Sequence, residues 1–238
     1  MATISEFWEM ADDARLDTEY KSDEKLKYLR SAPPEVLKQV CLQYRYFTKE
    51  FPNNLGILIS KVPYGNFKSL MGEILSEELG EGVAERSHIQ LYDDFLVSIS
   101  LDEKTFEQSA HPDNVTLIEE IQELTQSQSA EYAIGLCGMG GECLCQVYLS
   151  NMHKNLIDNP YIVENQKNID WRFWDFHTGE ADIIHKQKVR QAISEVAELD
   201  SSNVDDLVNG YQKAKQNWDK FWDYTYNAAM KEGELIVN

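Results

Sequence analysis

Apolar residues recur at intervals of three and four along almost the whole chain, and this helical spacing is the feature that most restricts the possible folds. Between residues 34 and 51, for example, the apolar side chains are those of Leu37, Val40, Cys41, Tyr44, Phe47 and Phe51. Helix breakers are scarce, with 12 glycines and 6 prolines in 238 residues. No window of five residues alternates cleanly between apolar and polar, as a strand would. The spacing therefore predicts one all-α domain over residues 1–238, a bundle of about eight to ten helices.

The individual helices can be placed from the same pattern and from their end signals. A helix that contains Phe67 should stop at Gly80, and "HPDN" at 111–114 is a turn and helix-start signal. The remaining helices are expected at about 34–51, 91–99, 130–152, 178–199 and 204–230. No internal repeat and no linker divides them.

Charge and cysteine usage exclude several classes of protein. The net charge is −19 and the pI about 4.6, so a nucleic-acid partner is not expected. The beginning of the chain lacks a basic segment followed by an apolar run, which argues against a signal peptide. The sequence contains no stretch of 18 uninterrupted apolar residues, so no membrane span is expected. Three of the four cysteines crowd one segment and none has the spacing of a disulfide framework, so we interpret all four as reduced thiols of a cytoplasmic protein.

The segment "FHTGEADIIH" at 176–185 places two histidines and two acids together. The apolar stripe of the helix expected at 178–199 leads back, in steps of three and four, to His185 and Asp182, so both side chains should face the interior. His177 lies five residues before Asp182, about 140° away on a regular helix. It joins the same face only through a π-type bulge or broken turn, which Thr178 and Gly179 would permit. Glu180 should point outward as first-turn charge.

In three other expected helices, counting in steps of three and four along the apolar stripe places a polar side chain on the inward face. The stripe that contains Phe67 leads to Glu78, and the stripe of the 91–99 helix leads back to His88. Glu142 follows "CGMGG", where each glycine costs about 0.8–1.0 kcal/mol relative to alanine inside a helix. Three glycines so close together indicate a close backbone approach or room for a ligand beside the Glu142 carboxylate.

Buried ionised carboxylates are costly unless they are paired or bound to metal. Three carboxylates and three imidazoles suit two first-row metal ions, with iron as the expected metal and manganese as the second option. Helical bundles build such sites from facing side chains. The predicted ligands are Glu78, His88, Glu142, His177, Asp182 and His185, of which Glu142 and His185 are also predicted to be catalytic.

Together, "SEELGEGVAERSH", "GGE" and "FHTGEADIIH" resemble the haem-oxygenase-like di-metal oxidases of the TenA/PqqC-like fold, including the CADD-like proteins. The resemblance implies a haem-oxygenase-like helical bundle, often a homodimer. It also implies a non-haem di-iron oxidase or oxygenase that uses O2 on a small carboxylate- or amine-containing metabolite. Four residues separate His177 from Asp182 here where the family pattern has three, which makes His177 the least secure match.

Several alternatives stay open at this stage. Glu85 could replace Glu78, because Glu85 and His88 form an E-x-x-H pair. A TenA-like pyrimidine hydrolase would need a nucleophilic cysteine, for which Cys137 is the best candidate. A metal-free PqqC-like oxidase and a non-catalytic CADD-like interaction protein are further possibilities. His111 and His153 are interpreted as loop and helix-end residues. The aromatic run "WRFWDF" at 171–176 is interpreted as core, with the wall of a substrate pocket as the alternative.

Overall fold

A computed structural model describes residues 2–108, 110–177, 188–195 and 204–237. Regular structure in these ranges consists of helices, with no strand among them, which confirms the predicted all-α class. No helix in the described ranges is both long enough and apolar enough to cross a membrane.

The longest helices are α1, α2 and α11, and shorter ones lie between them in the chain. The α-helices are α1 (Ile4–Leu26), α2 (Pro34–Lys61), α3 (Asn66–Glu78), α4 (His88–Ser98), α5 (Pro112–Ser127), α6 (Ala130–Ala133), α7 (Cys145–Leu156), α8 (Pro160–Asn165), α9 (Arg172–His177) and α11 (Val204–Val237). A π-helix, η4 (Ile134–Leu144), joins α6 to α7. The short 3-10 helices include η2 (Ala84–Arg86) and η3 (Glu103–Gln108).

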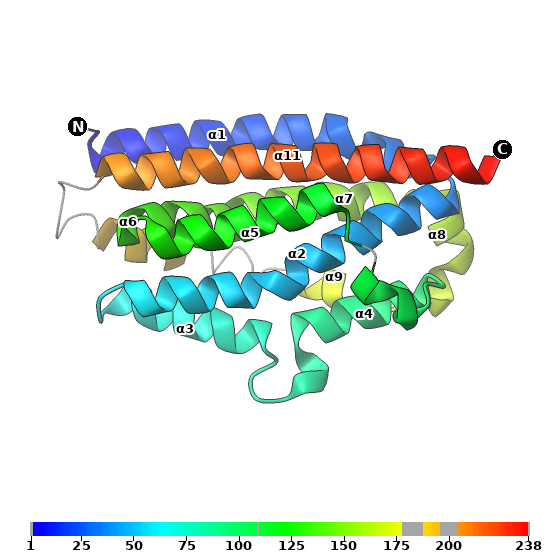
Figure 1. Ribbon diagram of the computed structural model, residues 1–238, viewed down its shortest axis with the longest axis horizontal. Coiled ribbons are helices and arrows are strands. Elements are labelled where there is room, and N and C mark those ends of the chain that lie inside the picture. Colours follow the sequence, from blue (N-terminus) through cyan, green and yellow to red (C-terminus); the bar gives the residue numbers. More distant parts are fainter. Residues whose placement is uncertain (1, 109, 178–187, 196–203, 238) are drawn as a thin grey trace.

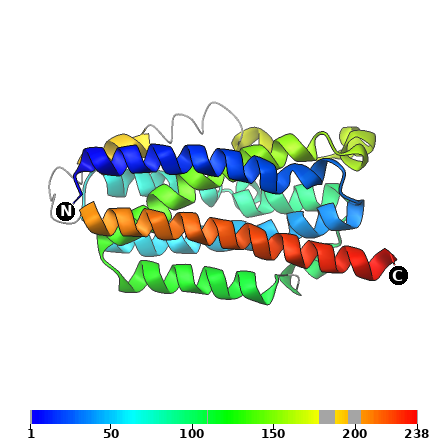
Figure 2. The ribbon, with the colours of Figure 1, turned by 90° about the horizontal axis from the view of Figure 1, so that it is seen from above.

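The helices form layers (Figure 1). Helices α1 and α11 run side by side along one face, α3 and α4 lie on the opposite face, and α2 crosses between them from the side of α11 towards α3. Figure 2, seen from above, shows α1 and α11 spanning the length of the bundle. Helix α11 packs against η4, α2 and α6, so it closes the interior over the middle of the chain.

The ends of several helices follow local chemistry. Thr3 and Glu6 form a reciprocal capping box at the start of α1. Helix α5 begins at the predicted "HPDN" signal, where Nδ1 of His111 accepts a hydrogen bond from the backbone N–H of Asp113. Helix α3 ends at Glu78, and Gly80 follows with φ +79°, a left-handed conformation that glycine adopts without penalty.

The segment 130–152 is helical as predicted but departs from regular α geometry. Its central part is the π-helix η4, which carries Glu142. Counting 100° per residue, as in an α-helix, therefore assigns side chains of η4 to the wrong face. The predicted close backbone approach is confirmed, because a Cβ at Gly140 would lie 2.0 Å from Cβ of Ala214, and one at Gly135 would lie 2.3 Å from the backbone oxygen of Leu207.

Candidate metal centre

Two of the predicted ligands lie at the two ends of one tight connection. Glu78 is the last residue of α3 and His88 the first of α4. Gly80 lies so close to the following backbone that a Cβ there would be 2.2 Å from the carbonyl oxygen of Val83. The side chain of Ser87 caps α4 by accepting from the N–H of Gln90. The compact loop thereby brings the carboxylate of Glu78 and the imidazole of His88 together.

These two side chains meet a third predicted ligand, His177, at the end of α9. Ligand atoms of Glu78, His88 and His177 all lie within 4.8 Å of one another. Nδ1 of His88 is 2.9 Å from Oε1 of Glu78, and the side chains are only 6% and 11% exposed. Two ligand atoms about 2.1 Å from one ion and at right angles are about 3.0 Å apart. The spacing of the pair therefore suits a shared metal ion.

The environment of His177 prepares one ring nitrogen for ligation. Its Nδ1 is 2.7 Å from the carbonyl oxygen of Phe173, and a carbonyl can only accept, so Nδ1 carries the proton and donates. Nε2 is then left with its lone pair. Burial is the main cause that lowers the pKa of His177 from 6.5 to about 4, and the nearby imidazole of His88 lowers it further. A neutral imidazole held by a backbone carbonyl is the usual arrangement of a metal-binding histidine.

Glu142 lines a cavity to which Glu78 and His177 of this cluster also contribute. The described residues that line the cavity are Tyr44, Phe47, Thr48, Phe51, Glu78, Gly141, Glu142, Cys145, Gln146, Leu149, Phe173 and His177. Its volume is about 40 Å³, which is room for about one or two water molecules. The cavity therefore has space for a small ion or a small molecule beside Glu78, Glu142 and His177.

The other predicted site residues have different outcomes. Asp182, His185 and Glu180 lie outside the described residues, as does the bulge predicted after His177. Glu85 lies exposed on η2, so the structure favours Glu78 as the acid beside His88.

The two remaining histidines lie elsewhere. His111 caps α5, and His153 stacks on the ring of Trp174 with centroids 5.3 Å apart. Phe173 and Trp174 of "WRFWDF" are buried, which confirms their core position.

Sequence reasoning missed several residues of the cavity wall. Tyr44, Phe47 and Phe51 carry an apolar stripe of α2, and this pattern does not distinguish a cavity wall from ordinary core. The Tyr44 hydroxyl is 3.3 Å from Sγ of Cys145, and burial raises the pKa of Tyr44 well above its ordinary value. Thr48 and Gln146 add neutral polar groups whose position only the packing of α2 against η4 and α7 reveals.

Solved structures with the same architecture define the class of this fold. A domain of unknown function with a haem-oxygenase-like fold from Shewanella denitrificans aligns over 100% of this chain and 96% of its own, with TM-score 0.70 and 16% identity. A CADD-like protein of unknown function from Nostoc punctiforme aligns over 95% and 96%, with TM-score 0.70 and 14% identity. A TenA homologue from Pseudomonas syringae pv. tomato covers 96% and 93%, with TM-score 0.68 and 12% identity. The chain thus has the haem-oxygenase-like fold, as predicted.

The family is shown by sequence as well. The profile of a family described as iron-containing redox enzymes matches residues 38–219. The chain therefore belongs to that family of iron-containing redox enzymes. No curated protein matches the chain.

Proposed function

We propose that this protein is a non-haem di-iron oxidoreductase that uses O2 to oxidise a small metabolite bearing a carboxylate or an amine. The observation that carries the proposal is the convergence of Glu78, His88 and His177 from three helices onto one point, with the His177 ring neutral and oriented by a carbonyl. One carboxylate and two imidazoles form a donor set that suits ferrous iron. The match to an iron-containing redox family supports the same metal.

In this proposal the chain's own residues hold two ions and keep water away from them. Glu78, His88 and His177 would hold one ion, and Glu142, which lines the same cavity, would bind the second. Asp182 and His185 complete the set as the sequence predicts. Iron bound here would supply the electrons that reduce O2. Phe47, Phe51, Leu149 and Phe173 make much of the remaining wall apolar, which limits the access of water to the reacting groups.

The structure gives little support to cysteine-based hydrolysis. Cys137 is fully buried, and burial raises the pKa of its thiol to about 12. Its sulfur pairs with Oγ1 of Thr125 at 2.9 Å. The nucleophile of such a reaction is the thiolate, which is scarce at neutral pH when the pKa is that high. A metal-free oxidase and a non-catalytic interaction protein remain as alternatives, and both predict a protein without bound iron.

Metal content tests the proposal most directly. Protein expressed with added iron should contain up to two iron ions per chain and should consume O2 after anaerobic reduction. Glu142→Ala should lower both the iron content and the O2 consumption while the helical circular dichroism spectrum stays unchanged. Glu85→Ala is the matched control, because it removes an exposed acid from the loop beside His88. The proposal fails if the Glu142→Ala protein retains as much iron as the parent, or if only Glu85→Ala loses it.

We further expect a cytoplasmic homodimer, as the family resemblance implies. Light scattering coupled to size-exclusion chromatography measures the mass of the assembly in solution. A mass of one chain, 27.5 kDa, would contradict the dimer and leave the metal centre untouched.

A further inference from the structure

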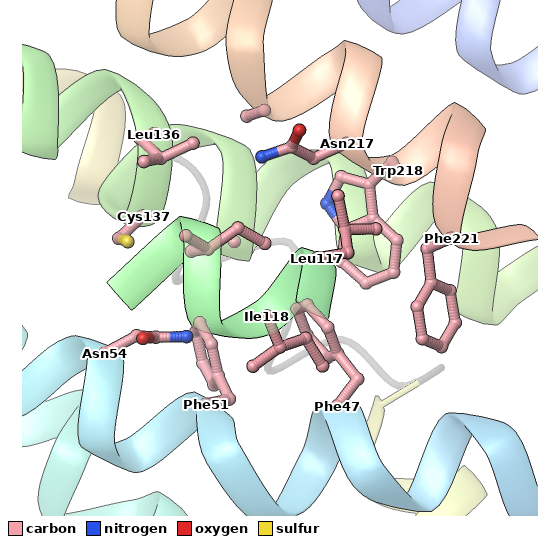
Figure 3. Close-up of a pocket in the computed structure, with 13 residues that line it drawn as sticks. Phe47, Phe51, Asn54, Leu117, Ile118, Leu136, Cys137, Asn217, Trp218 and Phe221 are labelled. Atoms are coloured by element: carbon pink, nitrogen blue, oxygen red, sulfur yellow. The ribbon is translucent and has the colours of Figure 1, made fainter. Parts of the chain in front are cut away.

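A second, mostly apolar pocket shares part of its wall with the metal cavity. Figure 3 shows the residues that line this second pocket. Phe47 and Phe51 of α2 face Trp218 and Phe221 of α11 across it, and α5 supplies Leu117 and Ile118. None of the described residues that line it carries a charge. An isolated ion would be poorly solvated there, so the pocket suits a neutral group.

Two buried amides lie on opposite sides of this pocket (Figure 3). Asn54 of α2 is 3% exposed and Asn217 of α11 is 2% exposed. Within the described part of the chain, no hydrogen-bond partner reaches Oδ1 of Asn54 or either polar atom of the Asn217 amide. Asn155, equally buried, shows the contrast, because its Nδ2 donates to the carbonyl of Asn151 and its Oδ1 accepts from Arg30. Unpaired buried amides destabilise a fold, and each requires an explanation such as a ligand or a water.

The pocket shares three residues with the metal cavity, namely Phe47, Phe51 and Gly141. The absence of a side chain at Gly141 lets the Phe51 ring approach the π-helix, since a Cβ there would be 2.6 Å from Cε2 of Phe51. Among the described residues, these two rings and the η4 backbone at Gly141 form a wall common to the metal cavity and the pocket that contains the two amides. A movement of the rings would join the two spaces.

The pocket is narrow when these rings are in place. It spans about 410 Å³ of space not filled by atoms, of which the centre of a water-sized molecule can occupy about 20 Å³. That is room for about one water molecule. A branched or bulky group would require more of the wall to move than an unbranched chain would.

We propose that this pocket is a substrate subsite for an unbranched aliphatic metabolite whose far end carries a neutral group that both donates and accepts hydrogen bonds, such as a carboxamide. The inference rests on the proposed function, which places the reacting amine or carboxylate end in the metal cavity. Methylene groups lie between the Phe47 and Phe51 rings and α11. The amides of Asn54 and Asn217 bind the far end and select it by hydrogen bonding. A site built to pair with a polar group discriminates against an apolar isostere, because the isostere leaves the site's own amides unpaired.

Binding to the metal-free protein tests this subsite without depending on iron. Aminocaproamide and its isostere, in which an isopropyl group replaces the terminal carboxamide, are titrated into chelator-treated protein by calorimetry. Shorter and longer homologues of each compound test the length. The ammonium group suits the acidic end formed by Glu78 and Glu142. At the best length, we expect the carboxamide to bind about tenfold more tightly than the isopropyl compound.

Asn54→Leu and Asn217→Leu supply the matched variants. Each replaces an amide that has at least one unpaired polar atom, Oδ1 in Asn54 and both atoms in Asn217, by an apolar group of similar shape. The melting temperature should therefore stay the same or rise, while the preference for the carboxamide should be lost. The subsite is refuted if no length binds, if the isopropyl compound binds the parent equally well, or if the preference survives both substitutions. The two-compound comparison on the parent stands even if a variant fails to fold. Absence of iron in the protein would overturn the proposed function and leave this measurement intact.

Discussion

The contact between Gly140 of η4 and Ala214 of α11 allows a sharp test of how Glu142 is held. In Gly140→Ala, the new Cβ would lie 2.0 Å from Cβ of Ala214, far inside the 3.4 Å at which ordinary contact begins. Both atoms are fixed to helix backbones, so the helices themselves must separate. Overpacking of this kind costs about 1–3 kcal/mol, and the alanine returns at most about 1 kcal/mol of helix propensity. Because no flexible side chain can yield, we expect a net loss of about 2 kcal/mol, or about 4–8 °C in melting temperature for a chain of this size.

Three further variants isolate the cause. Gly72→Ala, in the exposed part of α3, has no atom within 4 Å of its Cβ, and it should be neutral or raise stability by up to about 1 kcal/mol. Ala214→Gly removes the atom that collides, so the double variant Gly140→Ala/Ala214→Gly should recover most of the loss. Urea unfolding of the parent, Gly140→Ala, Ala214→Gly and the double variant gives the coupling energy between positions 140 and 214, which we expect to exceed about 1 kcal/mol. Equal losses in the single and double variants would refute the reasoning.

The same series connects packing to the metal centre. Gly140 lies two residues before Glu142, so a displaced η4 should also displace the carboxylate. We expect iron content to fall in Gly140→Ala and to return in the double variant, while Gly72→Ala keeps the parent value. Unchanged iron in a destabilised Gly140→Ala protein would show that Glu142 does not depend on this contact.

Two other predictions concern buried polar groups. Arg45, 8% exposed in its side chain, pairs with Asp93 at 2.6 Å and 2.9 Å. Arg45→Met should therefore cost about 3 kcal/mol in urea unfolding by leaving a half-buried carboxylate unpaired, whereas Lys49→Met, at a more exposed ion pair, should cost less than about 1 kcal/mol; similar losses would contradict this. The Cys137 thiol, with its pKa raised to about 12 by burial, should resist iodoacetamide at pH 8 in the folded protein and react in urea, as peptide mass spectrometry can show; labelling of the native protein at the unfolded rate would refute it.

Much of the fold could be predicted because the spacing of apolar residues indicates a helix even where the exact helix geometry cannot be deduced. Helices α2 and α5 begin at the predicted residues, Pro34 and Pro112, since proline at a helix start and the "HPDN" cap are local signals. Helix α1 was not predicted from the apolar spacing. Its buried positions include Thr18 and Ser22 beside Phe7 and Ala11, so its inner face carries few of the apolar residues by which a stripe is recognised.

The candidate site was predictable in its chemistry more than in its geometry. Glu78 and His88 lie at the ends of apolar stripes, and the structure places them together, because the inward face of a regular helix follows from counting. That count cannot reveal which helix ends meet, and so it did not show that His177 at the end of α9 lies beside His88 at the start of α4. The unpaired amides Asn54 and Asn217 had no distinguishing signal in the sequence, since asparagine on a helix is ordinarily solvated.

Glu142 shows why local propensity and function can oppose each other in one segment. A glycine-rich π-helix is intrinsically less stable than an α-helix of the same length, so η4 needs support from outside. The backbone of α11 provides it through contact with Gly135 and Gly140, and Trp218 of α11 donates from Nε1 to the carbonyl oxygen of Gly140 at 2.9 Å. Larger residues at the glycine positions would improve helix propensity and abolish the contacts that hold the segment in place. The stability that η4 lacks locally is thus supplied by α11, and the position of the Glu142 carboxylate depends on a helix distant in sequence.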